Sequence, residues 1–232
     1  YYSLAERLTL QPLTRLATTI QRVSFPTFSS IQNDNTQLRS GYLRSVQGLI
    51  LAMGPVIAGV FVFAPEIASL LNKTPMLPVL RLLAAATMLK IVGTMVGSMF
   101  MAKGKANWSF YWSIFSLCVL IPAMYFYGLP RGVAGVAEVV AASSLLFLLL
   151  SQHLANRLID LPFTTYLAAL VRPALVVACV FALLFFTRPL LPGPPLAVLS
   201  AGSAVGVVAT LAAFGLIAND LCRTYWKSVR GR

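Results

Sequence analysis

A single lysine interrupts an otherwise apolar stretch of the sequence. Lys90 lies within residues 82–102, and spacings of three and four residues put Thr87, Thr94 and Gly97 on the same helical face. An ammonium group near the centre of a bilayer costs several kcal/mol unless it is hydrated or paired. The pattern predicts a cation that faces a cavity and binds an anionic substrate. The alternatives are a lysine that reaches to the membrane surface and one that pairs with a buried acid.

A stripe of polar side chains follows one face of the helix that we expect over residues 1–25. Its members recur every three or four residues, and they are Arg7, Gln11, Arg15, Thr18 and Arg22. We call this set the polar stripe. Because lipid cannot solvate it, a spanning helix must turn the stripe toward protein or toward a water-filled cavity. The alternative is an amphipathic helix lying on the membrane surface.

These two patterns together suggest an anion-binding cavity. Arg15 and Lys90 are the cations expected inside spans, whereas Arg7 and Arg22 are expected nearer to the interfaces. Two separated cations that face one cavity suit a phosphate or pyrophosphate group. We therefore predict a substrate site whose main contacts are Arg15 and Lys90. The further candidates are Arg7, Gln11 and Arg22.

Few other side chains could do chemistry. Glu138 is the acid that lies well inside a span, so it is a candidate for proton coupling; the alternative places it at the outer interface or beside a neighbouring cation. The single histidine, His153, and the scattered Cys118, Cys179 and Cys222 have no metal-ligand spacing. We find no nucleophile–base set and no glycine-rich phosphate loop. We therefore expect neither an enzyme nor a bound cofactor or metal.

The composition indicates which elements position these residues. Apolar residues make up 58% of the chain and charged residues 10%, against about 25% charged in soluble domains. A helix needs about 20 residues to cross a bilayer. Beside residues 1–25, suitable runs cover residues 45–65, 82–102, 106–130, 132–152, 167–187 and 189–219. The sequence therefore predicts an all-α integral membrane protein, a bundle of about seven transmembrane helices.

The basic residues predict the orientation. The net charge of +12 is spread between the apolar runs, which argues against nucleic-acid binding. Cytoplasmic loops carry an excess of Lys and Arg. If the first span runs inward, one side holds Arg22, Arg39, Arg44, Lys103, Lys105, Arg157, Arg172, Arg223, Lys227, Arg230 and Arg232. The other side holds Arg7, Lys73, Arg81, Arg131 and Arg188. We expect the richer side, with the C-terminal tail, to be cytoplasmic.

Residues 12–44 contain a recognisable pattern. A helix ends in a Val-x-Phe-Pro-x-Phe-Ser sequence and is followed by a Gln-x-Asp loop and a basic turn with a tyrosine. The matching residues are Val23, Phe25, Pro26, Phe28, Ser29, Gln32, Asp34, Leu38 and Tyr42. The stretch is similar to the second half of bacterial polysaccharide flippases of the O-antigen and colanic-acid exporter type, in the multidrug/oligosaccharidyl-lipid/polysaccharide superfamily. A weaker match is residues 102–105, Ala-Lys-Gly-Lys, where the family often has Ala-x-Gly-Arg.

The resemblance implies two six-helix lobes around a central cavity, with two extra C-terminal helices in some members. It also implies alternating access, in which undecaprenyl-pyrophosphate-linked glycan moves from the cytoplasmic to the periplasmic leaflet of the inner membrane. On this expectation residues 1–152 line the cavity as the second lobe, residues 153–222 form the extra pair, and residues 223–232 form a basic cytoplasmic tail. The expected partners are membrane lipid, the missing N-terminal lobe and, as a candidate, a polysaccharide polymerase. The chain begins with Tyr1 and Tyr2, and we expect a fragment of a larger protein.

Three other functions stay open at this stage. A multidrug or cation antiporter of the same superfamily needs carboxylates inside the bundle, and Glu138 is the one available. A membrane polysaccharide polymerase or ligase usually carries a large catalytic loop, whereas the longest loop expected here, about residues 26–42, has one acid. A non-catalytic membrane scaffold is the third possibility.

Overall fold

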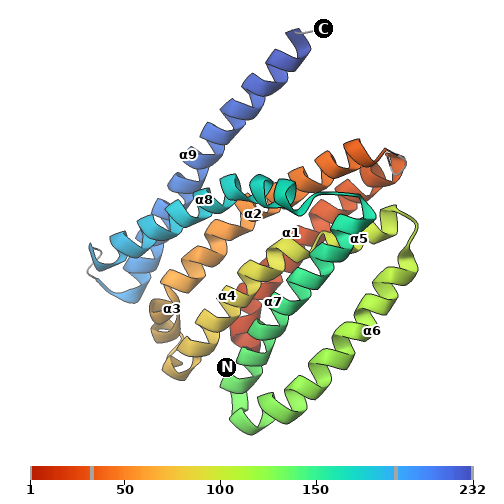
Figure 1. Cartoon of the computed structure of the whole chain (residues 1–232). Coiled ribbons are helices and arrows are strands. Elements are labelled where there is room, and N and C mark those ends of the chain that lie inside the picture. The colour runs from red at the N-terminus through yellow and green to blue at the C-terminus, as the bar shows by residue number, and fades with distance from the viewer. Residues whose placement is uncertain (1, 32–33, 191–192, 231–232) are drawn as a thin grey trace.

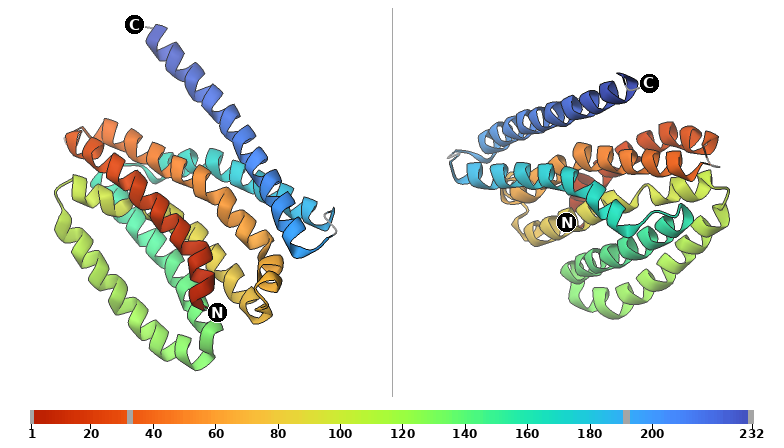
Figure 2. Two further views of the ribbon diagram at one scale, coloured as in Figure 1. Left: turned by 180° about the vertical axis from the view of Figure 1, so that it is seen from behind. Right: turned by 45° about the horizontal axis from the view of Figure 1, so that its top comes forward.

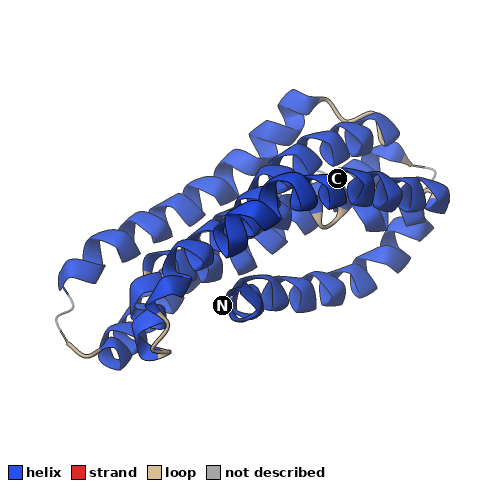
Figure 3. Ribbon diagram, turned by 90° about the horizontal axis from the view of Figure 1, so that it is seen from below, coloured by secondary structure: helices blue, strands red, loops and turns tan. Residues whose placement is uncertain are grey.

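The computed structural model describes residues 2–31, 34–190 and 193–230, and it describes their side chains except at 23–27, 106 and 213–230. These residues form helices and contain no strand (Figure 3). The α-helices are α1 (Tyr2–Ser30), α2 (Asn35–Val62), α3 (Ala64–Leu70), α4 (Leu77–Gly93), α5 (Val96–Ala102), α6 (Ala106–Ala123), α7 (Gly132–Leu158), α8 (Phe163–Thr187) and α9 (Pro195–Arg230). Shorter helical turns cover Thr74–Met76, Met124–Gly128, Leu129–Arg131 and Arg188–Leu190.

The long helices confirm the predicted fold class. Within the described residues, five apolar segments are long enough to cross a membrane: Asn35–Val62, Thr74–Ala102, Asn107–Leu158, Phe163–Leu190 and Pro195–Ala212. The third contains two antiparallel helices, α6 and α7, which are joined by the turns after residue 123 (Figure 1). With the more polar α1, the described part of the chain supplies seven long helices. The chain is a multi-pass membrane protein.

The helix boundaries correct one expectation. The long loop expected over residues 26–42 is mostly helical, because α1 continues to Ser30 and α2 begins at Asn35. Tyr42, expected in a turn, lies on α2 and is fully buried. The described polar residues of this region therefore lie on two helix ends, which we expect at the membrane surface, where water can solvate them.

Helix α4 is at the centre of the bundle. It packs against α1, α2 and α7, while α8 packs along α2 and α9 packs against α3, α8 and α2 (Figures 1 and 2). Two glycines allow α8 and α9 to approach α2 closely. A Cβ at Gly54 would overlap the side chain of Val177, and a Cβ at Gly202 would overlap the ring of Phe63. Small residues serve the same purpose in other membrane helix pairs, because they let backbones come together.

A network of polar groups joins three loops at one end of the bundle. The Asp34 carboxylate accepts the backbone N–H groups of Gln37 and Thr36, which lowers the pKa of the Asp34 carboxyl and caps α2. The next residue, Asn35, accepts a hydrogen bond from Lys103 Nζ at 2.6 Å and donates one to Asp160 at 2.9 Å. These bonds tie the start of α2 to the turns after α5 and α7, and they give Asp34 and Lys103 of the recognised pattern a structural role.

A second polar network lies inside the bundle. Tyr42 Oη donates to Gln152 Oε1 at 3.0 Å, and Gln152 Nε2 donates to Asn156 Oδ1 at 2.7 Å. All three side chains are buried between α2 and α7. Such bonds are maintained in membranes because the separated groups find no water there.

We expect the substitution Tyr42→Phe to lower the free energy of unfolding by about 1 kcal/mol, since Gln152 Oε1 then loses its buried donor. Thermal unfolding of the full-length protein in detergent measures this. The matched control is Tyr125→Phe, because Tyr125 is 65% exposed. Equal melting temperatures for the two variants would show that the Tyr42 hydroxyl contributes nothing.

Candidate functional site

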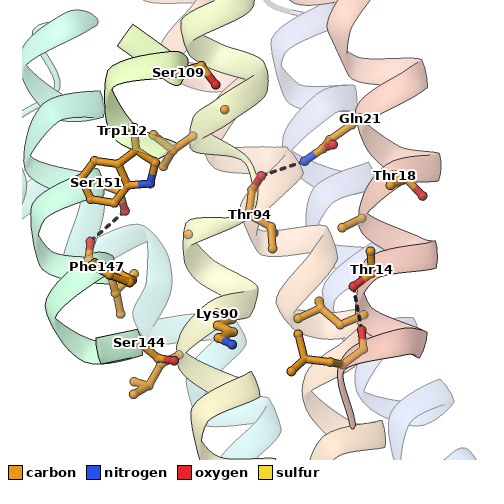
Figure 4. A pocket seen from close by; sticks show the side chains of 18 of the residues that line it. Thr14, Thr18, Gln21, Lys90, Thr94, Ser109, Trp112, Ser144, Phe147 and Ser151 are labelled. Carbon is orange, nitrogen blue, oxygen red and sulfur yellow. Dashed lines mark hydrogen bonds between the residues drawn. The ribbon is translucent and has the colours of Figure 1, made fainter. Parts of the chain in front are cut away.

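A cavity of about 350 Å³ lies among the membrane-spanning helices, between α1, α4, α5, α6 and α7. Its polar lining consists of Lys90, the amide of Gln21 and the hydroxyls of Thr14, Thr18, Thr94, Ser109, Ser144 and Ser151 (Figure 4). The rest of the lining is apolar and includes Phe100, Trp112 and Phe147. We call this space the Lys90 cavity.

A break between α4 and α5 helps to form the cavity. Helix α4 ends at Gly93 and α5 begins at Val96, so the ladder of backbone hydrogen bonds is interrupted inside a span. Gln21 on α1 donates from Nε2 to the Thr94 carbonyl at 2.7 Å (Figure 4). At Gly97 a Cβ would meet nothing within 4 Å. The glycine therefore leaves space open that another residue would fill.

The substitution Gln21→Leu should destabilise this break by about 1 kcal/mol, because the Thr94 carbonyl would lose its hydrogen-bond donor on α1. The prediction can be checked by thermal unfolding of the full-length protein in detergent. Gln11→Leu is the control, since it makes the same change at an exposed position of the same helix. An unchanged melting temperature for Gln21→Leu would mean that the bond to Thr94 is not needed.

Lys90 lies in the last turn of α4, is half-buried and borders the cavity. Among the described residues, the ion pairs are Arg39–Asp160, Arg131–Glu138 and Arg188–Glu66, and none involves Lys90. The carboxylate of Glu6, an exposed residue on α1, attracts the Lys90 ammonium but lies beyond ion-pair distance from it. In the described structure Lys90 therefore borders a cavity, and no buried acid is paired with it.

The hydroxyl groups around Lys90 are oriented by their own helices. Thr14 donates to the Leu10 carbonyl at 2.8 Å, Thr18 to Arg15 at 2.8 Å, and Thr94 to Ile91 at 2.8 Å. The hydroxyls of Ser144 and Ser151 also bond to carbonyls of α7. Since the hydroxyl hydrogens of these five residues are used in this way, their oxygens remain as acceptors. The cavity can thus hold an anion at Lys90 and accept hydrogen bonds from hydroxyl groups of the same ligand.

The structure does not bring Arg15 into the Lys90 cavity. Arg7, Gln11, Arg15 and Arg22 are exposed on an adjacent face of α1, and Thr18 is the one member of the polar stripe that lines the cavity. Figure 2 (left) shows α1 in red at the front of the bundle, uncovered by other helices. Exposed arginines within a bilayer need water or further protein beside them.

The remaining sequence candidates lie away from the cavity. Glu138 is exposed in the second turn of α7, and its Oε2 is 3.6 Å from Arg131 Nη1, as in the alternative of an acid beside a neighbouring cation. Cys118 and Cys179 are exposed, and His153 borders a different groove. The described residues contain no group of His, Cys, Asp or Glu that could hold a metal ion.

Several lining residues were missed in the sequence. Thr18 follows Thr14 by four residues and Gln21 follows Thr18 by three, so these residues form a neutral polar face that meets the polar stripe at Thr18. The sequence did not identify Ser144, Ser151 and Trp112 as lining residues, because small hydroxyl and aromatic side chains are common in membrane helices.

Known proteins resemble this chain in sequence. Residues 1–72 match the profile of a family described as "Polysaccharide biosynthesis protein". Lipopolysaccharide biosynthesis protein WzxC of Escherichia coli (strain K12) is 31% identical over 58% of this chain and 28% of its own length. Teichuronic acid biosynthesis protein TuaB of Bacillus subtilis (strain 168) is 26% identical over 79% of this chain and 39% of its own length. Amylovoran biosynthesis protein AmsL of Erwinia amylovora is 26% identical over 52% of this chain and 32% of its own length.

A solved structure also resembles the chain. The lipid II flippase MurJ in an inward closed conformation superposes with a TM-score of 0.72 at 17% sequence identity, over 96% of this chain and 47% of that chain. The chain spans about a third of the length of the curated relatives that it matches. These comparisons agree with the resemblance expected from residues 12–44: the chain is a multi-pass membrane protein that is similar in sequence to bacterial polysaccharide-biosynthesis proteins, and it has the helical fold of the lipid II flippase MurJ.

Proposed function

We propose that this chain is the second half of a flippase that exports lipid-linked oligosaccharide or polysaccharide repeat units across the bacterial inner membrane by alternating access. The observation that carries the proposal is the Lys90 cavity. In this cavity the Lys90 ammonium lies among hydroxyl acceptors inside a membrane bundle, and among the described residues no acid pairs with it. A glycan joined to a lipid through a diphosphate carries both the negative charge and the hydroxyl donors that this lining fits. The proposed activity moves its substrate without covalent chemistry.

The substrate in this proposal is an undecaprenyl-pyrophosphate-linked glycan. Lys90 binds the diphosphate, and the hydroxyls of Thr14, Thr94 and Ser151 accept hydrogen bonds from the sugars. The rings of Trp112 and Phe147, whose centroids are 5.9 Å apart, supply an apolar wall against which a sugar ring can pack.

The polar stripe provides a second cationic surface in this proposal. Arg15 and Arg7 face the rest of the full-length protein across a water-filled central cavity, because lipid would not solvate their exposed side chains. Residues 1–152 belong to the lobe that lines this cavity, residues 153–222 form the additional pair, and residues 223–232 form a cytoplasmic tail. The end of the bundle that carries Lys103, Lys105 and Arg157 is cytoplasmic, as the excess of basic residues there favours.

The proposal is tested by deleting the full-length gene and measuring surface polysaccharide together with lipid-linked intermediates. Loss of the surface glycan, with repeat units held at the inner leaflet, supports the flippase. Unchanged glycan with altered sensitivity to cationic drugs would favour an antiporter. Shorter polymer with repeat units reaching the outer leaflet would instead indicate an enzyme that acts after the transfer.

A further inference from the structure

A second hollow lies on the other side of the α6–α7 pair from the Lys90 cavity. It has a volume of about 370 Å³. Its walls come from Trp108, Tyr111, Trp112 and Phe115 of α6 and from Leu150, His153 and Leu154 of α7. We call it the α6–α7 groove. It shares one residue with the Lys90 cavity, since Trp112 lines both spaces.

The groove opens on an outer, apolar face of the bundle. Trp108, Tyr111 and Phe115 are 40%, 65% and 41% exposed, although all three are large and aromatic. The same helix exposes further large apolar side chains, among them Ile114 and Leu117. In a membrane protein such a face lies against acyl chains, and a Trp- and Tyr-rich end of a span lies at the level of the headgroups.

Two cations lie at the headgroup end of this groove. Lys105 Nζ is 5.1 Å from the centroid of the Trp108 ring, and the lysine is exposed. Arg157 follows His153 by four residues on α7, so it lies one turn farther toward the same end, and it is also exposed. The acid nearest in sequence, Asp160, accepts a hydrogen bond from Asn35 and lies 4.0 Å from Arg39. This end of the groove is therefore positively charged.

We propose that the α6–α7 groove is a binding site for an anionic phospholipid of the bilayer. The phosphate lies between Lys105 and Arg157, the ring of His153 offers a hydrogen-bonding group to the glycerol region, and one acyl chain packs along the aromatic and leucine walls. Basic pockets between transmembrane helices bind acidic headgroups on the cytoplasmic side in the same manner. The lining has little polarity beyond His153, so it suits a hydrocarbon chain better than a glycan. This site does not depend on the function proposed above.

Bromine-labelled lipids can test the site, because bromine on an acyl chain quenches indole fluorescence on contact. The full-length protein is prepared with Trp108 and Trp112 as its only tryptophans, the others being replaced by phenylalanine, and is placed in phosphatidylcholine vesicles. Brominated phosphatidylglycerol should reach half-maximal quenching at a mole fraction about tenfold below that of brominated phosphatidylcholine. The double variant Lys105→Gln/Arg157→Gln should bring the two values within about twofold. The control Arg131→Gln, at the opposite end of α7, should keep the preference.

Three results would overturn the proposal. Equal quenching by the two lipids would mean an unselective apolar face. Absence of quenching by either would mean that another part of the full-length protein covers the groove. Loss of the phosphatidylglycerol effect on adding undecaprenyl phosphate at about 1 mol% would assign the groove to the carrier lipid instead. Native mass spectrometry of the full-length protein with its natural tryptophans gives an independent reading: anionic phospholipid should stay bound and should be lost in the double variant.

Discussion

Replacing Lys90 by glutamine should reduce export of the glycan at least tenfold in the full-length protein, while its amount in the membrane stays unchanged. Lys90 is the cation that lines the cavity, and among the described residues no acid pairs with it. A hydrogen bond to a charged group contributes about 1.5–3 kcal/mol, which corresponds to about tenfold or more in binding. Folding should tolerate the change, because a neutral side chain is easier to keep inside a bilayer than an unpaired ammonium. Export is measured as surface polysaccharide in cells that lack the chromosomal copy.

Two further variants make this prediction specific. Lys90→Arg keeps the positive charge and should retain part of the export activity. Lys73→Gln removes a charge from an exposed position outside the cavity and should leave export unchanged. Full export by Lys90→Gln would refute a role of this ammonium in binding the substrate.

Filling the Lys90 cavity should stop export without unfolding the protein. Gly97 lines the cavity, and a Cβ at this position would meet no heavy atom within 4 Å. Phenylalanine at position 97 would therefore project into open space, and α5 would gain a residue of higher helix propensity than glycine. We expect Gly97→Phe to lower export at least tenfold, because the side chain takes the space that the sugar and diphosphate need, while the melting temperature in detergent stays within a few degrees.

The matched control is Gly48→Phe. Gly48 lies on α2, is exposed and likewise has nothing within 4 Å of a Cβ, but it does not line the cavity. Export should be normal in this variant. If Gly97→Phe folds and still exports at the normal rate, the substrate does not pass through this cavity.

The fold was largely predictable because a bilayer imposes a simple rule on sequence. Every spanning helix needs a long apolar run, and these runs are visible at 45–65, 132–152 and 167–187 without knowledge of their neighbours. The error over residues 26–42 has a related cause. Helix ends at the membrane surface are rich in Ser, Asn and Gln, and this composition is also typical of loops. The sequence alone did not separate these two arrangements.

The site was predictable only in part. Lys90 was found because a charge inside an apolar run is rare and needs a reason. The periodicity of the polar stripe showed that Arg15 shares a face with Arg7 and Arg22, but it could not show toward which neighbour that face turns. The rotation of a helix about its axis is set by packing, and packing turned Thr14, Thr18 and Gln21 toward the Lys90 cavity. The opening at Gly97 also depends on the break after Gly93, where Gln21 of a distant helix supplies the missing hydrogen bond.

The recognised pattern gains a physical meaning from the structure. Asp34 and Lys103 are 69 positions apart in the sequence. Asp34 nevertheless caps α2, and the first residue of that helix, Asn35, accepts a hydrogen bond from Lys103. Tyr42 anchors α2 to α7 through Gln152. These residues fix the positions of helices around the cavity and need not touch the substrate.

The most direct test of the central claim is to capture the substrate inside the Lys90 cavity. A photo-crosslinking photo-leucine, which is nearly the size of leucine and so leaves the cavity open, replaces the cavity-lining Leu10 in the full-length protein in its host, and the adducts are identified by mass spectrometry. We predict an adduct with the lipid-linked glycan that disappears when Lys90→Gln is added. An adduct with ordinary phospholipid alone, unaffected by Lys90→Gln, would contradict it and show that the cavity is filled by the bilayer.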